Sequence, residues 1–388
     1  MSQPRTTAGS NPPTATSGDP YRVVVVDDSA IIRGLLARTL EADPEIKVVE
    51  TVSNGQLAIG AVKRSAPDVV VLDIEMPVMD GLTALPELIK GDPTVKVIMA
   101  STLTLRNADI SMRALALGAA DYIPKPTSSG DISQGYDFKR ELVAKVKALG
   151  AARRASGTPR PVPVRHAEAG AKPAPGHAPS VYRDVEVRLR EAPTVVPAVV
   201  GIGTSTGGPQ ALFQLLPLIA KNLRQPILIT QHMPATFTTI LAEHIQKLAG
   251  CPAAEAVDGE PLVGGKIYIA PGNYHMTVAT AEGRNVVRLD QNPPENFCRP
   301  AVDPMLRSLA QVFGRNVLAV ILTGMGHDGL KGSEAVVGAG GVVIAQDAAT
   351  SVVWGMPGAV ATAGLCSAVL PIGEIGTYML KLAVRKAA

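Results

Sequence analysis

The sequence predicts an α/β protein with two doubly wound parallel sheets joined by a linker. Short runs of Val, Ile and Leu alternate with longer amphipathic stretches, which is typical of β-α-β units and a parallel sheet. The alternation covers residues 21–150, stops, and resumes over residues 194–388. Residues 151–193 are rich in Pro, Ala and Arg and have no hydrophobic periodicity, so we expect a linker there.

The composition allows two large hydrophobic cores. The chain has 388 residues, of which 46% are hydrophobic and 18% charged, and its net charge is +3. This charge is too small to indicate a nucleic-acid partner. The three cysteines lie far apart and form no CxxC pair, which favours reduced thiols over a disulfide framework or a zinc site.

The first residues of the chain predict no structure. Residues 1–20 are polar and rich in Pro, Ser and Thr, and they lack the apolar core of a secretion signal, so we expect a disordered tail. No apolar run approaches the ~18 residues of a membrane helix. These observations predict a soluble, cytoplasmic protein.

Five strands and five helices are expected in the first domain. Ser29 is a plausible N-cap of the first helix, because a short hydroxyl side chain can accept a hydrogen bond from the first free amides. The expected strands are 22–28, 46–51, 68–74, 95–101 and 120–124. The expected helices are 29–43, 54–65, 82–90, around 107–118, and 136–149.

The second domain repeats the pattern with longer loops. Helices are expected at 208–223 and 237–250, each after a strand. The expected strands are 195–203, 225–231, 266–272, 286–290, 316–324 and 341–346. Because ligands bind at the carboxyl ends of parallel strands, the residues that follow these strands are the candidates for function.

Carboxylates follow two strands of the first domain. Asp27 and Asp28 come after the first strand, and Asp73 ends the third. Clustered carboxylates repel one another, and a hard divalent cation is the usual remedy. Ser101 and Lys125 follow the fourth and fifth strands. A hydroxyl, an ammonium and a metal around one aspartate are suited to holding a phosphoryl group.

At VDDSA, VVVLDIEMPVMDG, IMAST and DYIPKP, in that order, the segment 21–150 resembles the receiver domain of response regulators, which has a flavodoxin-like fold. The resemblance implies that a histidine kinase phosphorylates Asp73. It also implies Mg²⁺ held by Asp28 and Asp73, with Asp27 nearby and the Glu75 carbonyl as a further ligand. Ser101 and Lys125 would sense the phosphate.

The stretch VVGIGTSTGGPQ, residues 199–210, carries the main candidate of the second domain. Its glycines miss the dinucleotide-binding spacing by one residue, which disfavours a nucleotide site. The G-x-S-x-G pattern is satisfied around Ser205. Such a turn exposes the serine hydroxyl beside amides at the start of a helix, Thr206 among them, and these favour a developing oxyanion.

A serine nucleophile needs a base and a group that orients the base. His232 follows the next strand, and Asp328 lies in a glycine-rich turn after a later one. Three strand ends on one edge of a sheet supply the geometry of a triad. The chain order Ser-His-Asp differs from the Ser-Asp-His order of α/β-hydrolases, so the fold need not be theirs.

Other residues compete for these roles. His327 is an alternative base, but it adjoins Asp328 and neighbouring side chains usually point apart. His244 and His275 are interpreted as ordinary helix and strand residues. Cys298 lacks a turn like that around Ser205, so a small buried thiol is favoured over a nucleophile. Two residues in RPAVDPML either line the substrate cleft or pair at the start of a helix, namely Arg299 and Asp303.

At GTSTGG, QHMP, IAPG, RPAVD, TGMGHDG and WGMPGAV the second domain resembles the Rossmann-like catalytic domain of the chemotaxis protein-glutamate methylesterases, the CheB family. The resemblance implies a triad of Ser205, His232 and Asp328, with the Met325 amide in the oxyanion hole and no cofactor for the esterase reaction. It implies methylated chemoreceptors as substrates, glutamine deamidation as a second activity, and a chemotaxis kinase as phosphodonor. The alternative is a receiver joined to a non-enzymatic binding module.

Overall fold

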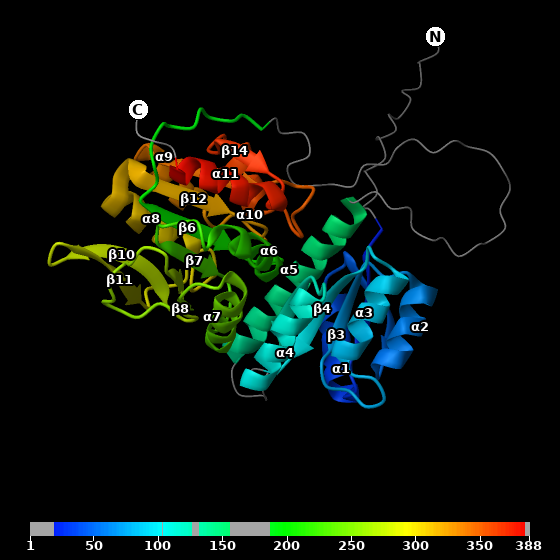
Figure 1. Ribbon diagram of the computed structural model, residues 1–388. Helices are drawn as coiled ribbons and strands as arrows, with labels where there is room; N and C mark the ends of the chain where they lie inside the picture. The colour runs from blue at the N-terminus through cyan, green and yellow to red at the C-terminus, as the bar shows by residue number, and fades with distance from the viewer. Residues whose placement is uncertain (1–18, 103, 126–131, 156–186, 385–388) are drawn as a thin grey trace, which may run out of the picture.

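Two α/β units pack side by side in the computed structural model of the protein (Figure 1). The structure describes residues 19–102, 104–125, 132–155 and 187–384. The predicted disordered tail, except its last two residues, and most of the predicted linker lie outside these ranges. Each unit contains a parallel sheet with helices on both faces, which confirms the predicted fold class.

The first unit contains one five-stranded parallel sheet in the order β2-β1-β3-β4-β5. Val23, Val24 and Val71 are fully buried because helices cover both faces of this sheet. The strands are β1 (Tyr21–Val26), β2 (Ile46–Val52), β3 (Val69–Asp73), β4 (Lys96–Ser101) and β5 (Asp121–Pro124). The helices are α1 (Ala30–Glu41), α2 (Gly55–Ser65), α3 (Gly81–Gly91), α4 (Leu105–Ala116) and α5 (Ile132–Ala155).

Side-chain caps fix where these helices begin. The Ser29 hydroxyl accepts a hydrogen bond from the Ile32 amide, which confirms the predicted N-cap of α1. Three further caps act in the same way at α2, α3 and α4: Asn54, Asp80 and Thr104. Each satisfies an amide that has no partner inside the helix and so fixes where that helix starts.

The second unit contains a seven-stranded parallel sheet in the order β14-β13-β12-β6-β7-β9-β8. Its strands are β6 (Val199–Thr204), β7 (Ile227–Gln231), β8 (Ala253–Glu255), β9 (Ile267–Ile269), β12 (Val317–Ile321), β13 (Val342–Gln346) and β14 (Ala368–Leu370). The predicted strand at 286–290 does not join this sheet. It belongs to β11 (Arg284–Asp290), which pairs antiparallel with β10 (His275–Ala281) in a separate hairpin.

Helices cover both faces of the second sheet (Figure 1). They are α6 (Gly208–Ile219), α7 (Ala235–Ala249), α8 (Val302–Phe313), α9 (Leu330–Gly338), α10 (Met356–Thr362) and α11 (Ile372–Val384), with a 3₁₀ turn at Gly314–Asn316. Their buried faces enclose the central strands β6, β7 and β12, which are buried along their whole length.

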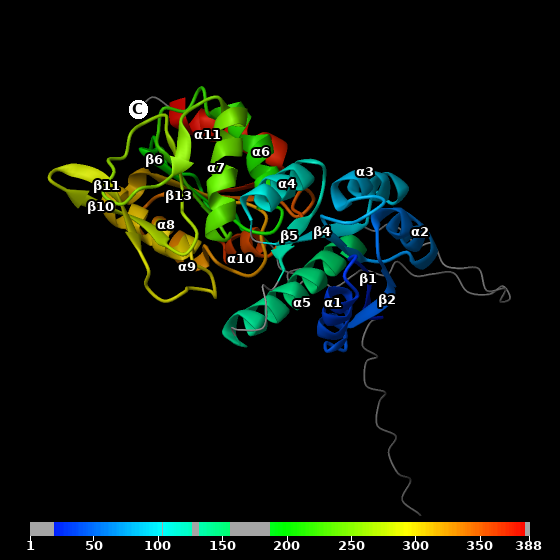
Figure 2. The ribbon, with the colours of Figure 1, turned by 90° about the horizontal axis from the view of Figure 1, so that it is seen from below.

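The two units share an apolar interface. Helix α4 lies against α6 and α7, as two views of the ribbon show (Figures 1 and 2). One hydrophobic cluster includes buried residues of both units, among them Met112 and Leu115 of α4 and Leu212 of α6. A second cluster includes Val353 of the second unit together with Leu142 and Val146 of α5. Apolar burial on this scale holds the first unit against the second.

One helix is longer than the sequence predicts. Helix α5 ends at Ala155, five residues into the segment 151–193 that we expect to be a linker. Its last turn is fixed by ion pairs: Arg153 contacts Asp68 and Asp92, and Arg154 contacts Asp68. Within the described residues, no helix is long and apolar enough to cross a membrane.

Candidate functional sites

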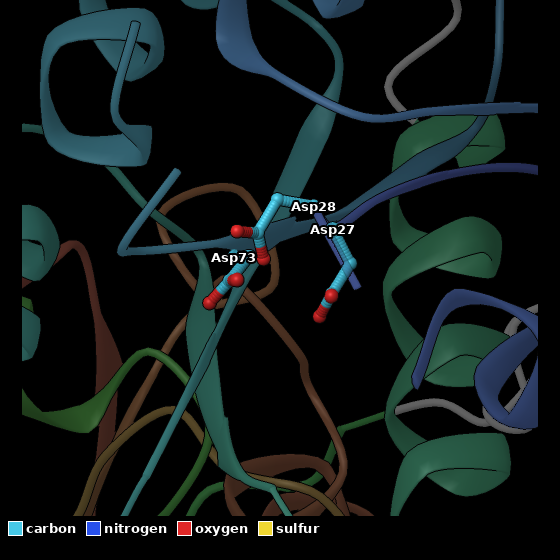
Figure 3. A group of neighbouring side chains, drawn as sticks. All are labelled: Asp27, Asp28 and Asp73. Atoms are coloured by element: carbon cyan, nitrogen blue, oxygen red, sulfur yellow. The ribbon is translucent and has the colours of Figure 1, made fainter. Parts of the chain in front are cut away.

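Three carboxylates gather at the carboxyl edge of the first sheet, as the sequence predicts (Figure 3). Asp27 and Asp28 follow β1, and Asp73 ends β3. Their oxygen atoms lie within 4.8 Å of one another. Asp27 and Asp73 are buried, whereas Asp28 is exposed. An all-oxygen donor set of this kind fits Mg²⁺.

Lys125 lies between two of these carboxylates. Its Nζ is 2.7 Å from Asp27 Oδ2 and 2.6 Å from Asp73 Oδ1. Burial raises the pKa of Asp73 above 3.8, although Lys125 opposes the shift. Three carboxyl groups thus face one ammonium, which again favours a divalent cation.

The other two residues predicted at the phosphate site, Ser101 and Glu75, have different surroundings. Ser101 ends β4 and is buried, and its hydroxyl lies 3.3 Å from the Ser111 hydroxyl of α4. Glu75 is exposed and lines a cavity of about 630 Å³ together with Asp28, Arg106 and Arg113. Two arginines and the exposed Asp28 of the carboxylate cluster thus share the wall of one cavity.

Adjacent strands carry the second site. In the sheet order β12-β6-β7, Ser205 follows β6, His232 follows β7 and Asp328 lies in the loop after β12. Thr204 and Gln231 are directly paired, so Ser205 and His232 are the next residues of two neighbouring strands. The structure thus brings the three predicted residues to one edge of the sheet.

The turn after Ser205 depends on two glycines. Gly207 has φ 77°, a left-handed conformation that glycine adopts without steric cost. A Cβ on Gly208 would lie 2.1 Å from Gln231 Oε1 and 2.3 Å from Thr204 Oγ1. The chain can therefore turn beside β7 only with glycine at position 208. Helix α6 begins at this residue, three residues after Ser205.

His232 and Asp328 are in direct contact. His232 Nε2 lies 2.7 Å from Asp328 Oδ2. Burial of the ring disfavours its charged form, but the Cys298 sulfur and the Asp328 carboxylate together raise the pKa of His232 well above 6.5. The pKa of Asp328 is held below 3.8 against its own burial, first by the His232 hydrogen bond. The carboxylate is therefore ionised and oriented toward the imidazole.

Backbone amides lock the Asp328 carboxylate in place. Oδ2 accepts from the Val302 amide at 2.6 Å, and Oδ1 accepts from the amides of Asp303 at 3.1 Å and Gly329 at 2.9 Å. The first two belong to the start of α8, whose dipole favours a negative charge there. Asp328 thus has one fixed rotamer to offer to His232.

Ser205 lies against the loop that follows β12. Its amide donates to the Thr323 carbonyl at 3.1 Å, and a Cβ on Gly324 would lie 2.9 Å from the Ser205 Cβ. Among the described residues, the Thr206 and Met325 amides have no hydrogen-bond acceptor. These two amides, which have no acceptor, belong to the two segments that meet at Ser205, as an oxyanion hole requires.

No hydrogen bond joins the Ser205 hydroxyl to His232 within the described part of the chain. The second ring nitrogen, Nδ1, instead faces the half-buried Cys298, whose Sγ lies 3.3 Å away. The sequence did not indicate this position, because Cys298 follows no strand of the parallel sheet. Asn296, two residues earlier, was also missed; its amide donates to Asp328 Oδ1 at 2.9 Å.

The competing candidates have other partners. His327 is exposed. His244 pairs with Asp109 of α4 at 3.0 Å, and His275 is buried between the Pro293 carbonyl and the Ala301 amide. Arg299 and Asp303 do not pair with each other among the described residues. Arg299 donates to two loop carbonyls, and Asp303 accepts from Asn296 and Gly332.

The first unit reaches the residue next to Ser205. The Thr206 hydroxyl donates to Asp121 Oδ2 of β5 at 2.7 Å, and both side chains are buried. Gln210 of α6 donates to the Ala119 carbonyl just before β5. The Arg140 guanidinium of α5 lies 4.4 Å from the centre of the Phe297 ring. The first unit, which carries the carboxylate cluster, therefore contacts the second unit directly beside Ser205.

These features define a class: an α/β protein with a receiver-type carboxylate site docked on a serine-histidine-aspartate site. Two family models match the chain. The response regulator receiver domain matches residues 23–136, and the CheB methylesterase matches residues 200–379. The chain belongs to the CheB family of protein-glutamate methylesterases/protein-glutamine glutaminases, because relatives of that name match it over almost their whole length.

Two relatives illustrate the similarity. A protein-glutamate methylesterase/protein-glutamine glutaminase of Azospirillum brasilense is 60% identical over 97% of this chain and 96% of that protein. One of Rhodospirillum centenum, of the group 2 operon, is 59% identical over 95% and 96%. The solved CheB methylesterase catalytic domain of Thermotoga maritima is 41% identical and covers 48% of this chain and 100% of that one, with a TM-score of 0.47.

Proposed function

We propose that this protein is a phosphorylation-controlled protein-glutamate methylesterase of chemotaxis. Residues 21–155 are its receiver domain, because α5 runs to Ala155. Residues 156–193 are its linker and 194–388 its catalytic domain, after a tail of residues 1–20. The observation that carries the proposal is the 2.7 Å contact of His232 with Asp328 beside the turn that holds Ser205. Relatives with the names of enzymes disfavour the alternative, a receiver with a non-enzymatic binding module.

The first half of the reaction transfers an acyl group to Ser205. The Ser205 Oγ attacks the γ-carbonyl carbon of a glutamyl methyl ester while His232 takes the hydroxyl proton and Asp328 stabilises the imidazolium. The carbonyl oxygen becomes an oxyanion, and the Thr206 and Met325 amides donate to it. When the ester bond breaks, His232 returns the proton to the departing methoxide, and methanol leaves.

The second half regenerates the serine. Water attacks the glutamyl-serine ester, and His232 accepts its proton and gives it to Ser205 Oγ. The substrate protein leaves with a glutamate side chain in place of the methyl ester. A glutamine side chain forms the same acyl-enzyme with ammonia as the leaving group. Deamidation is therefore a second activity of the same three residues, and neither half requires a cofactor.

Asp73 is the proposed phosphoryl acceptor. Asp27, Asp28 and Asp73 would hold Mg²⁺ with the Glu75 carbonyl, and the cation supplies charge neutralisation for the incoming phosphoryl group. Lys125 already contacts Asp73 and would pair with the new charge. The Ser101 hydroxyl would exchange Ser111 for a phosphate oxygen, so the bonds of β4 and α4 change with phosphorylation.

Docking of the receiver is the proposed means of control. Phosphorylation acts on β4, α4 and β5, and α4 and β5 touch the catalytic domain through Asp109, Asp121 and Tyr122. A change in these elements would weaken the docked arrangement and open the serine site. The substrates would be methylated chemoreceptors, the phosphodonor a chemotaxis histidine kinase, and the location the cytoplasm.

The test is methanol release from receptor membranes that carry labelled methyl esters, with and without a small phosphodonor. Wild-type protein should release methanol, and faster with the phosphodonor. Ser205→Ala should lose on the order of 10⁶ in kcat, whereas Ser367→Ala, before β14, should behave as wild type. Substantial turnover by Ser205→Ala would overturn the assignment.

A further inference from the structure

A two-residue turn brings the Cys298 thiol to the histidine. Glu295 and Cys298 exchange both backbone hydrogen bonds, at 3.1 and 2.8 Å, and the residues between them have φ 51° and 63°. Both angles are left-handed, as a tight turn of this length requires. Asn296 accepts this conformation readily, but a bulky residue such as Phe297 rarely adopts it. Strain of this kind persists where the surroundings fix it.

Asn296 fixes the turn to the triad. Its amide group donates to Asp328 Oδ1 at 2.9 Å and to Asp303 Oδ2 at 3.0 Å, so it bridges two buried carboxylates. Phe297 points outward and is 81% exposed. Cys298 points inward, which places its sulfur 3.3 Å from His232 Nδ1.

Both ring nitrogens of His232 have a partner, so neither is free to accept a proton from Ser205. In the neutral ring, the form that can act as a base, Nε2 donates to Asp328 and the only lone pair is at Nδ1. The Cys298 sulfur faces this nitrogen at 3.3 Å, and Ser205 must use the same nitrogen to lose its proton. Cysteine and serine therefore compete for one acceptor.

We propose that Cys298 is a positioning residue of the esterase site: its thiol occupies the base nitrogen of His232 in the resting enzyme and must yield it to Ser205 before acylation. The inference rests on the proposed function, and it assigns a role to a thiol outside the triad. It explains why His232 touches Asp328 and not Ser205 in this docked arrangement.

The first test needs no enzyme activity. Full-length protein is treated with iodoacetamide, and peptide mass spectrometry follows each of its three cysteines. Cys298 should react several-fold faster than the similarly half-buried Cys251 because its sulfur lies 3.3 Å from a basic ring nitrogen, while the buried Cys366 serves as the slow reference. His232→Gln should slow Cys298 several-fold and leave Cys251 unchanged. Equal rates at Cys298 and Cys251 in the wild type would overturn the proposal.

The second test uses two substitutions of the thiol. Cys298→Ala removes the competitor, so basal kcat for methanol release should rise several-fold with KM unchanged. Cys298→Ser keeps a hydroxyl that can still bond to Nδ1, so its kcat should stay below that of the alanine variant. A basal kcat of Cys298→Ala at or below that of wild type overturns the proposal.

The pH profile separates this role from simple packing. The charged groups around the ring are Asp328, with Asp303 behind it, and the Glu295–Arg307 ion pair at the base of the turn. All of them remain in both variants, so only the sulfur changes. Because the sulfur helps to raise the pKa of His232, the acid limb of kcat/KM should move to lower pH in both variants. An unmoved limb overturns the proposal, whereas turnover by Ser205→Ala overturns the esterase itself and leaves the alkylation result standing.

Discussion

Tyr122 of the receiver and Phe237 of the catalytic domain stack face to face across the domain boundary. Their ring centres are 4.2 Å apart and their planes differ by 11°. Tyr122 lies on β5 three residues before Lys125, and Phe237 lies in the first turn of α7, five residues after His232. The stack therefore connects the phosphate site to the helix that follows the proposed base.

Tyr122→Leu tests this connection because it keeps apolar volume and removes the stack. An aromatic pair contributes about 0.5–1.5 kcal/mol beyond its buried area, so the equilibrium constant for docking should fall by about two- to tenfold. Basal methanol release should rise, and the extra activation by a phosphodonor should shrink. Phe313→Leu, at the end of α8 in a cluster without receiver residues, is the control. An unchanged ratio of activated to basal rate in Tyr122→Leu would argue against control through this interface.

Asp73→Asn should abolish activation and keep basal activity. The substitution removes the phosphoryl acceptor at the edge of β3, far along the chain from the serine turn, and leaves an oxygen for Lys125. Chelation of divalent cations should have the same effect on the wild type, because three carboxylates within 4.8 Å need a cation to accept a phosphoryl group. Both are measured as methanol release with and without phosphodonor. Full activation in the presence of a chelator would contradict the metal site.

Asp328→Asn should reduce kcat by about 10⁴ because an amide no longer fixes the tautomer and charge of the imidazole. Asp303→Asn is the matched control. Asp303 is the second residue of α8 and accepts from the same Asn296 amide group as Asp328. Burial and the nearby Asp328 charge raise the pKa of Asp303, so a neutral amide replaces it with far less loss. Equal losses in the two variants would remove Asp328 from its proposed role.

Gly324→Ala tests the fit of the serine turn. A Cβ there would lie 2.4 Å from Met356 Sδ and 2.9 Å from the Ser205 Cβ. Overpacking costs about 1–3 kcal/mol, and a shift of Ser205 by 1 Å can cost about 10²-fold in rate. Gly338→Ala, at the end of α9 with nothing within 4 Å, should keep full activity. Activity and melting temperature measured on both variants decide; a fully active Gly324→Ala would show that the turn tolerates movement.

Much of this architecture follows from local sequence. Parallel strands put the next residue of each strand at one edge, so Ser205, His232 and Asp328 could be grouped from the apolar runs before them. The order β12-β6-β7 could not be predicted in the same way, because strand neighbours are chosen by packing between distant segments. The strand at 286–290 was expected in the main sheet, and its hairpin partner β10 was not predicted, for the same reason.

One prediction was wrong and one contact was missed, each for a specific physical reason. The basic residues near 153 look like a linker, yet Arg153 is buried against Asp68 and Asp92, and these contacts extend α5. The contact of Cys298 with His232 was missed because the neighbouring sequence does not indicate the left-handed turn at Asn296 and Phe297. The amide of Asn296 selects that turn by bonding to Asp328, and such a long-range contact has no sequence period.

The raised pKa of His232 makes stability and activity depend on pH in opposite directions. Burial opposes the charged ring, but Cys298 and Asp328 outweigh it, so the pKa lies well above 6.5. The resulting stabilisation of the fold is complete below pH 6.5 and is lost as the pH rises through the raised value. A general base must be neutral, so kcat/KM should rise over that same interval. Thermal unfolding and basal methanol release are followed together from below pH 6.5 upward. The melting temperature should fall over the pH range in which activity appears. His232→Gln should remove that fall in melting temperature. An acid limb of kcat/KM at or below pH 6.5 would contradict an imidazolium held by these two partners.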